Sequence, residues 1–234
     1  MKKIFFIFSF LTINFISFSQ EEICKNFQEK EIIKQEKNLL EKISIKEFYK
    51  KSKLNEKIDF KIFKMSVDGY NKIKNKNEDY LIIIDFSKES SKKRFYLINL
   101  FEGKIEAETY VAHGKNSGIE KAISFSDQTN SYKSSMGFFL TRNHYNGRYG
   151  YSIRLKGLEK GINSNAFVRG IVLHGAKESE ESYLKQYGFL GRTEGCPAIP
   201  LSLVKNILGR IPENTVLFIY GEDEKYFEKS CLIK

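Results

Sequence analysis

The sequence predicts a mainly β domain with peripheral helices (α+β), built as a sandwich or barrel and preceded by a small helical region. From Tyr80 onward, short apolar segments are separated by glycine-containing turns, a pattern typical of such β domains. Upstream of Tyr80, apolar residues recur at helical spacing. The 234 residues, 41% of them hydrophobic and 14% aromatic, suffice for one sizeable core and argue against disorder.

Residues 20–78 form the predicted helical region, to which we assign a packing role and no chemistry. The lysines and glutamates between its apolar positions are expected on solvated faces, and Gly69 weakens the second helical pattern near its end. The apolar positions are Ile32, Ile33, Leu39, Leu40 and Ile43 in a first helix, and Phe60, Phe63, Val67 and Tyr70 in a second.

Residues 79–222 form the predicted β domain, and residues 223–234 a C-terminal tail. Tyr80 to Phe86 is a continuous apolar run, as expected of a buried strand. Alternate residues from Ile105 to Val111 are expected on one buried face. The other expected elements are a hairpin with arms at 94–100 and 104–111, strands near 149–155, 171–174 and 215–220, and a short helix at 201–208.

Residues 1–19 have the pattern of a signal peptide. Lys2 and Lys3 precede an apolar segment from Ile4 to Ile16, and Ser17-Phe18-Ser19 supplies small residues where a signal peptidase cuts. The apolar run is shorter than the roughly 20 residues that span a bilayer, which disfavours an uncleaved anchor. We therefore expect cleavage near Ser19 and an exported protein of the periplasm or cell envelope, without stable membrane insertion.

The formal net charge of +10 comes from positive and negative residues that are interspersed along the chain. Without a concentrated basic patch or a nucleic-acid-binding motif, no nucleic acid partner is expected. A mild positive field would suit an anionic wall polymer or membrane surface, although a lysine-rich solvated surface explains the charge more simply.

The residues that could carry chemistry lie between Ile171 and Pro200. His174 ends an apolar run, and Cys196 follows 22 positions later, so the two could meet only through the fold. A thiolate is a nucleophile, and a nearby histidine is the usual base that generates it. Gly195 leaves room for a substrate backbone beside the thiol, and Pro197 lacks an N–H, so oxyanion donors must come from Cys196 and the residues before it.

Structural explanations exist for the same residues: a lone cysteine is often buried packing, and a histidine is often a satisfied core residue. Cys24 and Cys231 could form a disulfide in an oxidising compartment and leave Cys196 as the free thiol, but the sequence does not establish that pairing.

Two motifs, HGA at residues 174–176 and T-x-G-C at residues 193–196, are separated by sixteen residues. This arrangement resembles the signature of murein L,D-transpeptidase catalytic domains (YkuD type), in the branch whose active-site loop ends in GRSxGCPA. Upstream blocks at 111–118, 134–139 and 150–159 share the resemblance, which extends from about Tyr80 to Tyr220. The resemblance implies that Cys196 attacks the carbonyl of the diamino acid before a terminal D-Ala in a peptidoglycan stem peptide. With His174 as base, D-Ala would leave, and an amine of a second stem would resolve the thioester into a cross-link.

The same resemblance implies that no metal or organic cofactor is needed and that carbapenem β-lactams acylate Cys196. It also places His113, Gly175 and Ser117 on the substrate side of the cleft, although His113 could instead be an ordinary loop residue. His144 is expected in a loop, and a zinc site built from the histidines and Cys196 lacks the usual ligand spacing.

Two positions depart from the commonest family pattern: Glu194 stands where a histidine is frequent, and Ala198 where an arginine is frequent. Arg192 is the nearest replacement for that arginine and could bind a stem carboxylate, or it could be a surface residue. Thr193 could orient the loop or hold His174. Two other functions stay open, a carboxypeptidase or endopeptidase that uses water as acceptor and an inactive wall-binding protein.

Overall fold

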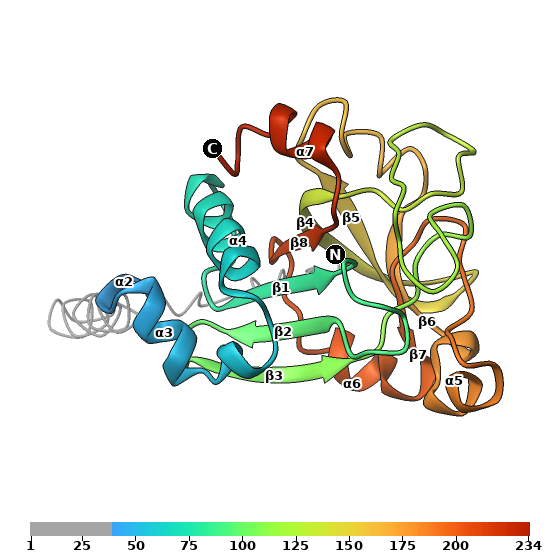
Figure 1. Cartoon of the computed structure of the whole chain (residues 1–234), viewed down its shortest axis with the longest axis horizontal. Helices are drawn as coiled ribbons and strands as arrows, with labels where there is room; N and C mark the ends of the chain where they lie inside the picture. The colour runs from blue at the N-terminus through green and yellow to red at the C-terminus, as the bar shows by residue number, and fades with distance from the viewer. Residues whose placement is uncertain (1–38) are drawn as a thin grey trace, which may run out of the picture. The chain divides into compact units, whose positions relative to one another are not determined.

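An eight-stranded mixed sheet dominates the computed structural model, which describes residues 39–234 (Figure 1). Helices lie at its periphery, which confirms the predicted fold class. The strand order is β3-β2-β1-β8-β4-β5-β6-β7. The strands are β1 Tyr80–Asp85, β2 Phe95–Asn99, β3 Lys104–Thr109, β4 Gly137–Gly147, β5 Gly150–Gly157, β6 Val172–Ala176, β7 Ala198–Pro200 and β8 Val216–Tyr220. The helices are α2 Leu39–Lys42, α3 Ile45–Lys51, η1 Leu54–Glu56, α4 Phe60–Lys72, η2 Lys177–Ser179, α5 Glu181–Tyr187, η3 Leu201–Leu203, α6 Val204–Leu208 and α7 Glu224–Lys229.

Strand β1 is buried on both faces, as its continuous apolar run predicts. It pairs antiparallel with β2 and parallel with β8. Leu81 and Ile83 pack into one hydrophobic cluster, whereas Ile82 and Ile84 pack into the other. The strand therefore joins the two halves of the core.

The hairpin of β2 and β3 forms as predicted, but the assignment of one buried face to the second arm is wrong. Leu97 pairs with Ala107 and Ile98 pairs with Ile105, so Glu106 is an extra residue in a β-bulge. An extra residue reverses the alternation of side chains. Ile105 consequently packs against one cluster and Ala107 against the other.

The two edges of the sheet are linked by the chain that leaves β3. Ala112 donates its N–H to the carbonyl of Ala198 in β7 at 2.8 Å, and the Ala198 N–H donates back at 3.3 Å. One step further, Gly114 forms a parallel bridge with Thr193. Because β3 and β7 are the outer strands, this crossing gives the sheet a barrel-like closure and covers an exposed edge.

The helices before residue 79 share a hydrophobic cluster with the sheet. Phe48 of α3 and Phe63 and Val67 of α4 pack in the same cluster as Leu81 and Phe218. Asp59 caps α4 by accepting the backbone N–H of Lys61 at 2.7 Å, which satisfies a donor at the helix start. The predicted helical positions at 20–38, the signal peptide at 1–19 and Cys24 lie outside the described residues.

Several elements were not expected from the sequence: β4, β7, α5 and α7. Within the predicted tail, α7 buries Tyr226, and the hydroxyls of Tyr226 and Ser230 both donate to the buried carboxylate of Glu159. The last residues are therefore part of the packed structure. Within residues 39–234, every helix is too short or too polar to cross a bilayer.

Gly69 lies inside α4 and permits its close approach to β4. A Cβ placed on Gly69 would lie 2.0 Å from Cζ of Phe138. The helix continues through this glycine to Lys72, since the missing side chain makes room for the aromatic ring.

We expect Gly69→Ala to lower the free energy of unfolding by about 1–3 kcal/mol, because overpacking outweighs the better helix propensity of alanine. Chemical denaturation measures this change. Asn71→Ala, at an exposed position of the same helix, is the control and should be neutral or slightly stabilising. Unchanged stability in Gly69→Ala would show that the ring of Phe138 is not confined by the helix.

Candidate active site

The parallel pairing of β6 and β7 brings His174 and Cys196 to one cleft. His174 pairs with Ala198, and its N–H donates to the carbonyl of Pro197 at 3.4 Å, so Cys196 lies just before the paired segment. Both side chains line a cleft of about 370 Å³. The other lining residues are Tyr149, Gly175, Ala176, Lys177, Glu178, Arg192, Thr193, Glu194 and Leu201.

His174 is a neutral imidazole whose tautomer is fixed by its own strand. Its Nδ1 lies 3.0 Å from the carbonyl oxygen of Gly175, and because a carbonyl only accepts, Nδ1 carries the hydrogen. Nε2 then has a lone pair, with no hydrogen-bond partner among the described residues. Burial lowers the pKa of His174 below 6.5, which keeps the ring unprotonated near neutral pH.

The ring of Tyr149 covers the imidazole of His174. The ring centroids are 4.4 Å apart with an interplanar angle of 22°. Tyr149 lies in the turn between β4 and β5 and is 37% exposed, so one side of the ring faces solvent while the other faces the base. The sequence predicts Tyr149 only as part of a strand. Its contact with His174 could not be predicted, because the two residues are far apart in the chain.

Cys196 forms the floor of the cleft, with 7% of its surface exposed. Its thiol donates to the carbonyl of Gly170 at 3.7 Å, and behind it the residue packs in the hydrophobic cluster that includes Ile199. Burial raises the pKa of the thiol above 9.0, whereas the backbone N–H of Val172 and the charge of Arg169 oppose that rise. The resting pair is therefore a thiol and a neutral imidazole.

The loop before Cys196 is fixed by Thr193. Its hydroxyl donates to the carbonyl of Cys196 at 2.6 Å and accepts the N–H of Gly195 at 3.1 Å. Thr193 thus orients the loop, the first of its two expected roles, and has no bond to His174. Since the Gly195 N–H is engaged, the amides of Glu194 and Cys196 are the ones with no acceptor among the described residues.

Gly195 is required by the backbone at this point. Its φ of +122° is disfavoured for any side chain, and a Cβ would lie 2.8 Å from the carbonyl oxygen of Lys133. The same carbonyl accepts a hydrogen bond from Arg169 at 2.7 Å. Arg169, which the sequence did not single out, also binds the carbonyl of Ser126 and the hydroxyls of Ser131 and Ser135.

His113 does not line the cleft, and its assignment to substrate binding is wrong. It is 1% exposed, and its Nδ1 accepts from Arg94 at 2.8 Å while Nε2 donates to the carbonyl of Gly118 at 3.2 Å. Burial and the Arg94 charge lower the pKa of His113 to about 4. Its role is structural, because its own carbonyl accepts the N–H of Thr193 at 2.9 Å.

Ser117 is also structural and not on the substrate side. It is 1% exposed, and its hydroxyl accepts the N–H of Ser134 at 2.9 Å. Gly175 does line the cleft, where a Cβ would lie 2.9 Å from Cβ of Val204. His144 lies in β4 and not in a loop, with Nε2 bound to the carbonyl of Ile211 at 2.9 Å.

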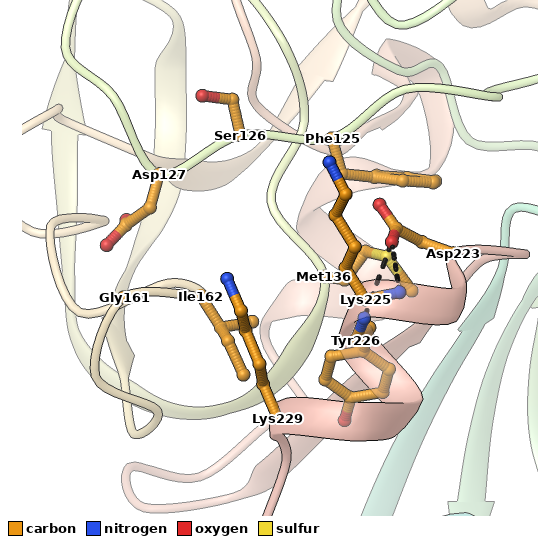
Figure 2. Close-up of a pocket in the computed structure, with 10 residues that line it drawn as sticks. All are labelled: Phe125, Ser126, Asp127, Met136, Gly161, Ile162, Asp223, Lys225, Tyr226 and Lys229. Atoms are coloured by element: carbon orange, nitrogen blue, oxygen red, sulfur yellow. Dashed lines mark hydrogen bonds between the residues drawn. The ribbon is translucent and has the colours of Figure 1, made fainter.

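A second pocket, of about 150 Å³, lies beside α7 (Figure 2). Its carboxylates are already bonded, since Asp223 accepts the N–H groups of Lys225 and Tyr226, and Asp127 accepts that of Asn165. Its lining contains neither cysteine nor histidine, so this pocket lacks the thiol and imidazole that the first cleft brings together. It is lined by Phe125, Ser126, Asp127, Met136, Gly161, Ile162, Asp223, Lys225, Tyr226 and Lys229. Among the residues described, His, Cys, Asp and Glu side chains form no group of three that could hold a metal ion.

Residues 54–220 match the model of the L,D-transpeptidase catalytic domain family. The chain belongs to this family. The match confirms the family that the sequence resembles, whereas the branch ending in GRSxGCPA stays a prediction. The match begins in η1, so the matched domain includes α4 as well as the sheet. A comparison with curated proteins gave no match.

Several solved structures are similar to this chain at low identity. The cell shape determining protein Pgp2 from Campylobacter jejuni is 16% identical with a TM-score of 0.42, covering 70% of this chain and 55% of that chain. The carbamoyl enzyme of Ldtfm with avibactam is 15% identical with a TM-score of 0.40, covering 63% of this chain and 51% of that one. LdtMt1 in complex with imipenem is 10% identical with a TM-score of 0.38, covering 61% and 59%. This chain thus covers little more than half the length of these proteins.

We predict that the alkylation of Cys196 by iodoacetamide is slow at pH 7 and still rises with pH where an ordinary thiol has levelled off, because burial raises the thiol pKa. A variant with Cys24→Ser and Cys231→Ser isolates this thiol, and the same variant in urea is the control. A fast rate that levels off below pH 7 would instead indicate a thiolate–imidazolium pair.

Proposed function

We propose that this protein is an exported cysteine acyltransferase that acts on peptidoglycan stem peptides, an L,D-transpeptidase in activity as well as in family. The single observation that supports it best is the presence of His174 and Cys196 in one cleft, held by the β6–β7 pairing. Family membership supplies the substrate class, and the side chains supply a nucleophile and a base.

In the first half-reaction, Sγ of Cys196 attacks the carbonyl of the diamino acid that precedes the terminal D-Ala. Nε2 of His174 accepts the thiol proton as the C–S bond forms. The N–H groups of Glu194 and Cys196 stabilise the oxyanion, and Val172 donates to the sulfur as its charge develops. The imidazolium then protonates the departing amine, so that D-Ala leaves and a thioester remains.

In the second half-reaction, an amine of another stem peptide attacks the thioester. A proton passes from the amine through His174 to the sulfur, which restores the thiol and leaves a new amide between two stems. The two half-reactions share one base and one set of amide donors, as expected of ping-pong acyl transfer.

Arg192 is suited to bind a carboxylate of the donor stem. It lines the cleft and is exposed, and its guanidinium forms no ion pair or hydrogen bond with the residues described. A planar guanidinium binds a carboxylate through two parallel hydrogen bonds. It would thereby take the part of the arginine that is frequent in the family at the position of Ala198.

The substrate is a polymer of the cell wall, so the proposed activity requires export. The basic and apolar pattern of residues 1–19 supports a location in the periplasm or cell envelope. Carbapenems are the proposed covalent inhibitors, in line with the imipenem complex of LdtMt1.

We expect a carbapenem to add to wild type and to Cys231→Ala, the control at an exposed cysteine, but not to Cys196→Ala. Intact mass measures the adduct. His174→Ala should slow its formation by roughly 10²–10⁴-fold, since the thiol loses its base. A folded wild-type protein that forms no adduct would contradict the proposal and favour a wall-binding protein without activity.

Digestion of purified muropeptides separates the two enzymatic outcomes. Dimers joined through third-position residues are the expected product. Trimmed tripeptides without dimers would show that water is the acceptor and that the protein is a carboxypeptidase or endopeptidase.

A further inference from the structure

The cleft contains opposite charges that the described residues leave unpaired. Lys177, Glu178 and Arg192 line it, and within residues 39–234 none of these side chains takes part in an ion pair or hydrogen bond. Glu194, by contrast, is 3.7 Å from the ammonium of Lys115. A cleft with a free carboxylate and a free guanidinium is complementary to ligands that carry both an ammonium and a carboxylate group.

The charges of Glu178 and Arg192 act on different neighbours. The carboxylate of Glu178 acts on the base, where it partly offsets the lowering of the His174 pKa by burial. The guanidinium of Arg192 acts on His113. Burial and Arg94 lower the pKa of His113, and the charge of Arg192 lowers it further. Among the free charges of the cleft, Glu178 is therefore the one that acts on the imidazole of His174.

The backbone of Glu178 is held in place. It lies in η2 directly after β6, and its carbonyl accepts the N–H of Gly191 at 2.8 Å. A Cβ on Gly191 would lie 2.4 Å from Cβ of Glu178, so the two segments are in close contact. A carboxylate on such a fixed support beside the base can position a cation without a large ordering cost.

We propose that Glu178 binds the ammonium group of the acceptor stem peptide beside His174 and thereby favours transfer to an amine over hydrolysis. The proposal rests on the function proposed above and assigns the acceptor as a peptide with a primary amine on its third residue. Arg192 remains the partner of the donor carboxylate, so each substrate would meet a residue of opposite charge in the cleft.

The acceptor arrives as an ammonium and releases one proton to solvent while it is held by Glu178. The resulting amine attacks the thioester carbon, the C–N bond forms, and the C–S bond breaks. Nε2 of His174 takes a second proton from the nitrogen and returns it to Sγ of Cys196, which leaves an amide and a thiol.

The test starts from the thioester formed with a donor tetrapeptide. It measures the ratio of dimer, formed by attack of the acceptor amine, to tripeptide, formed by attack of water. The acceptors are synthetic stem tripeptides with lysine or diaminopimelate at the third position. Glu178→Gln should lower the ratio of dimer to tripeptide about 5-fold at subsaturating acceptor, a loss expected for one charge-assisted contact in a half-open cleft. Glu181→Gln, the same charge change at an exposed position outside the cleft, should leave the ratio unchanged.

Two further readouts separate binding of a cation from a structural role. Hydroxylamine is a largely neutral nucleophile at pH 7, so Glu178→Gln should lower its capture of the thioester much less than it lowers capture by the acceptor peptide. Glu178→Asp should restore part of the dimer yield. Higher salt should raise the acceptor KM of wild type more than that of Glu178→Gln.

The outcomes for this inference and for the proposed function are distinct. If wild type fails to form a carbapenem adduct, the proposed function fails. If the adduct forms at the wild-type rate in Glu178→Gln and the dimer ratio is unchanged, only the role of Glu178 is overturned. An equal loss with hydroxylamine would also overturn it. Should Glu178→Gln fold poorly, absence of a salt effect on the wild-type acceptor KM would still contradict the inference.

Discussion

The short parallel ladder between β6 and β7 is the constraint on which the site depends. It pairs His174 with Ala198 and so fixes the imidazole relative to the segment that begins at Cys196. The bonds of Ala112 to Ala198 hold β7 from its other side. The base and the thiol are thus positioned mainly by backbone hydrogen bonds, which side-chain changes on the surface do not disturb.

The electrostatics of the site follow from burial. Removing both groups from water raises the pKa of the Cys196 thiol and lowers that of His174, so the uncharged pair is the stable resting form. In the proposed mechanism, hydrogen-bond donors stabilise the separated charges: the N–H of Val172 for the sulfur, and the amides of Glu194 and Cys196 for an oxyanion. The rigidity of the loop, through Thr193 and Gly195, keeps these donors in place before a substrate arrives.

Local sequence patterns were sufficient to predict most of β1, β2, β3, β8 and α4. Long apolar runs and helical spacing indicate directly which residues are buried. The face of Ile105 was misassigned since the bulge at Glu106 depends on pairing with β2, which no local pattern records. The short β7 has three residues and carries no alternation of its own. Its register is nevertheless what joins His174 to the segment that follows Cys196.

The site residues divide in the same way. His174 and Cys196 stood out because of their residue type and spacing. His113 was misassigned because its partner Arg94 directly precedes β2, where nothing in the sequence marks it as a buried cation. Tyr149 and Glu178 were missed since an aromatic or acidic residue acquires meaning only beside the imidazole, and that proximity is a property of the fold.

The ¹⁵N chemical shifts of the His174 ring at pH 7, assigned by their loss in His174→Gln, test the central claim most directly. The account predicts a neutral ring with hydrogen on Nδ1 and a lone pair on Nε2. A ring protonated on Nε2, or an imidazolium, would contradict it, since the thiol of Cys196 would then have no base in the cleft.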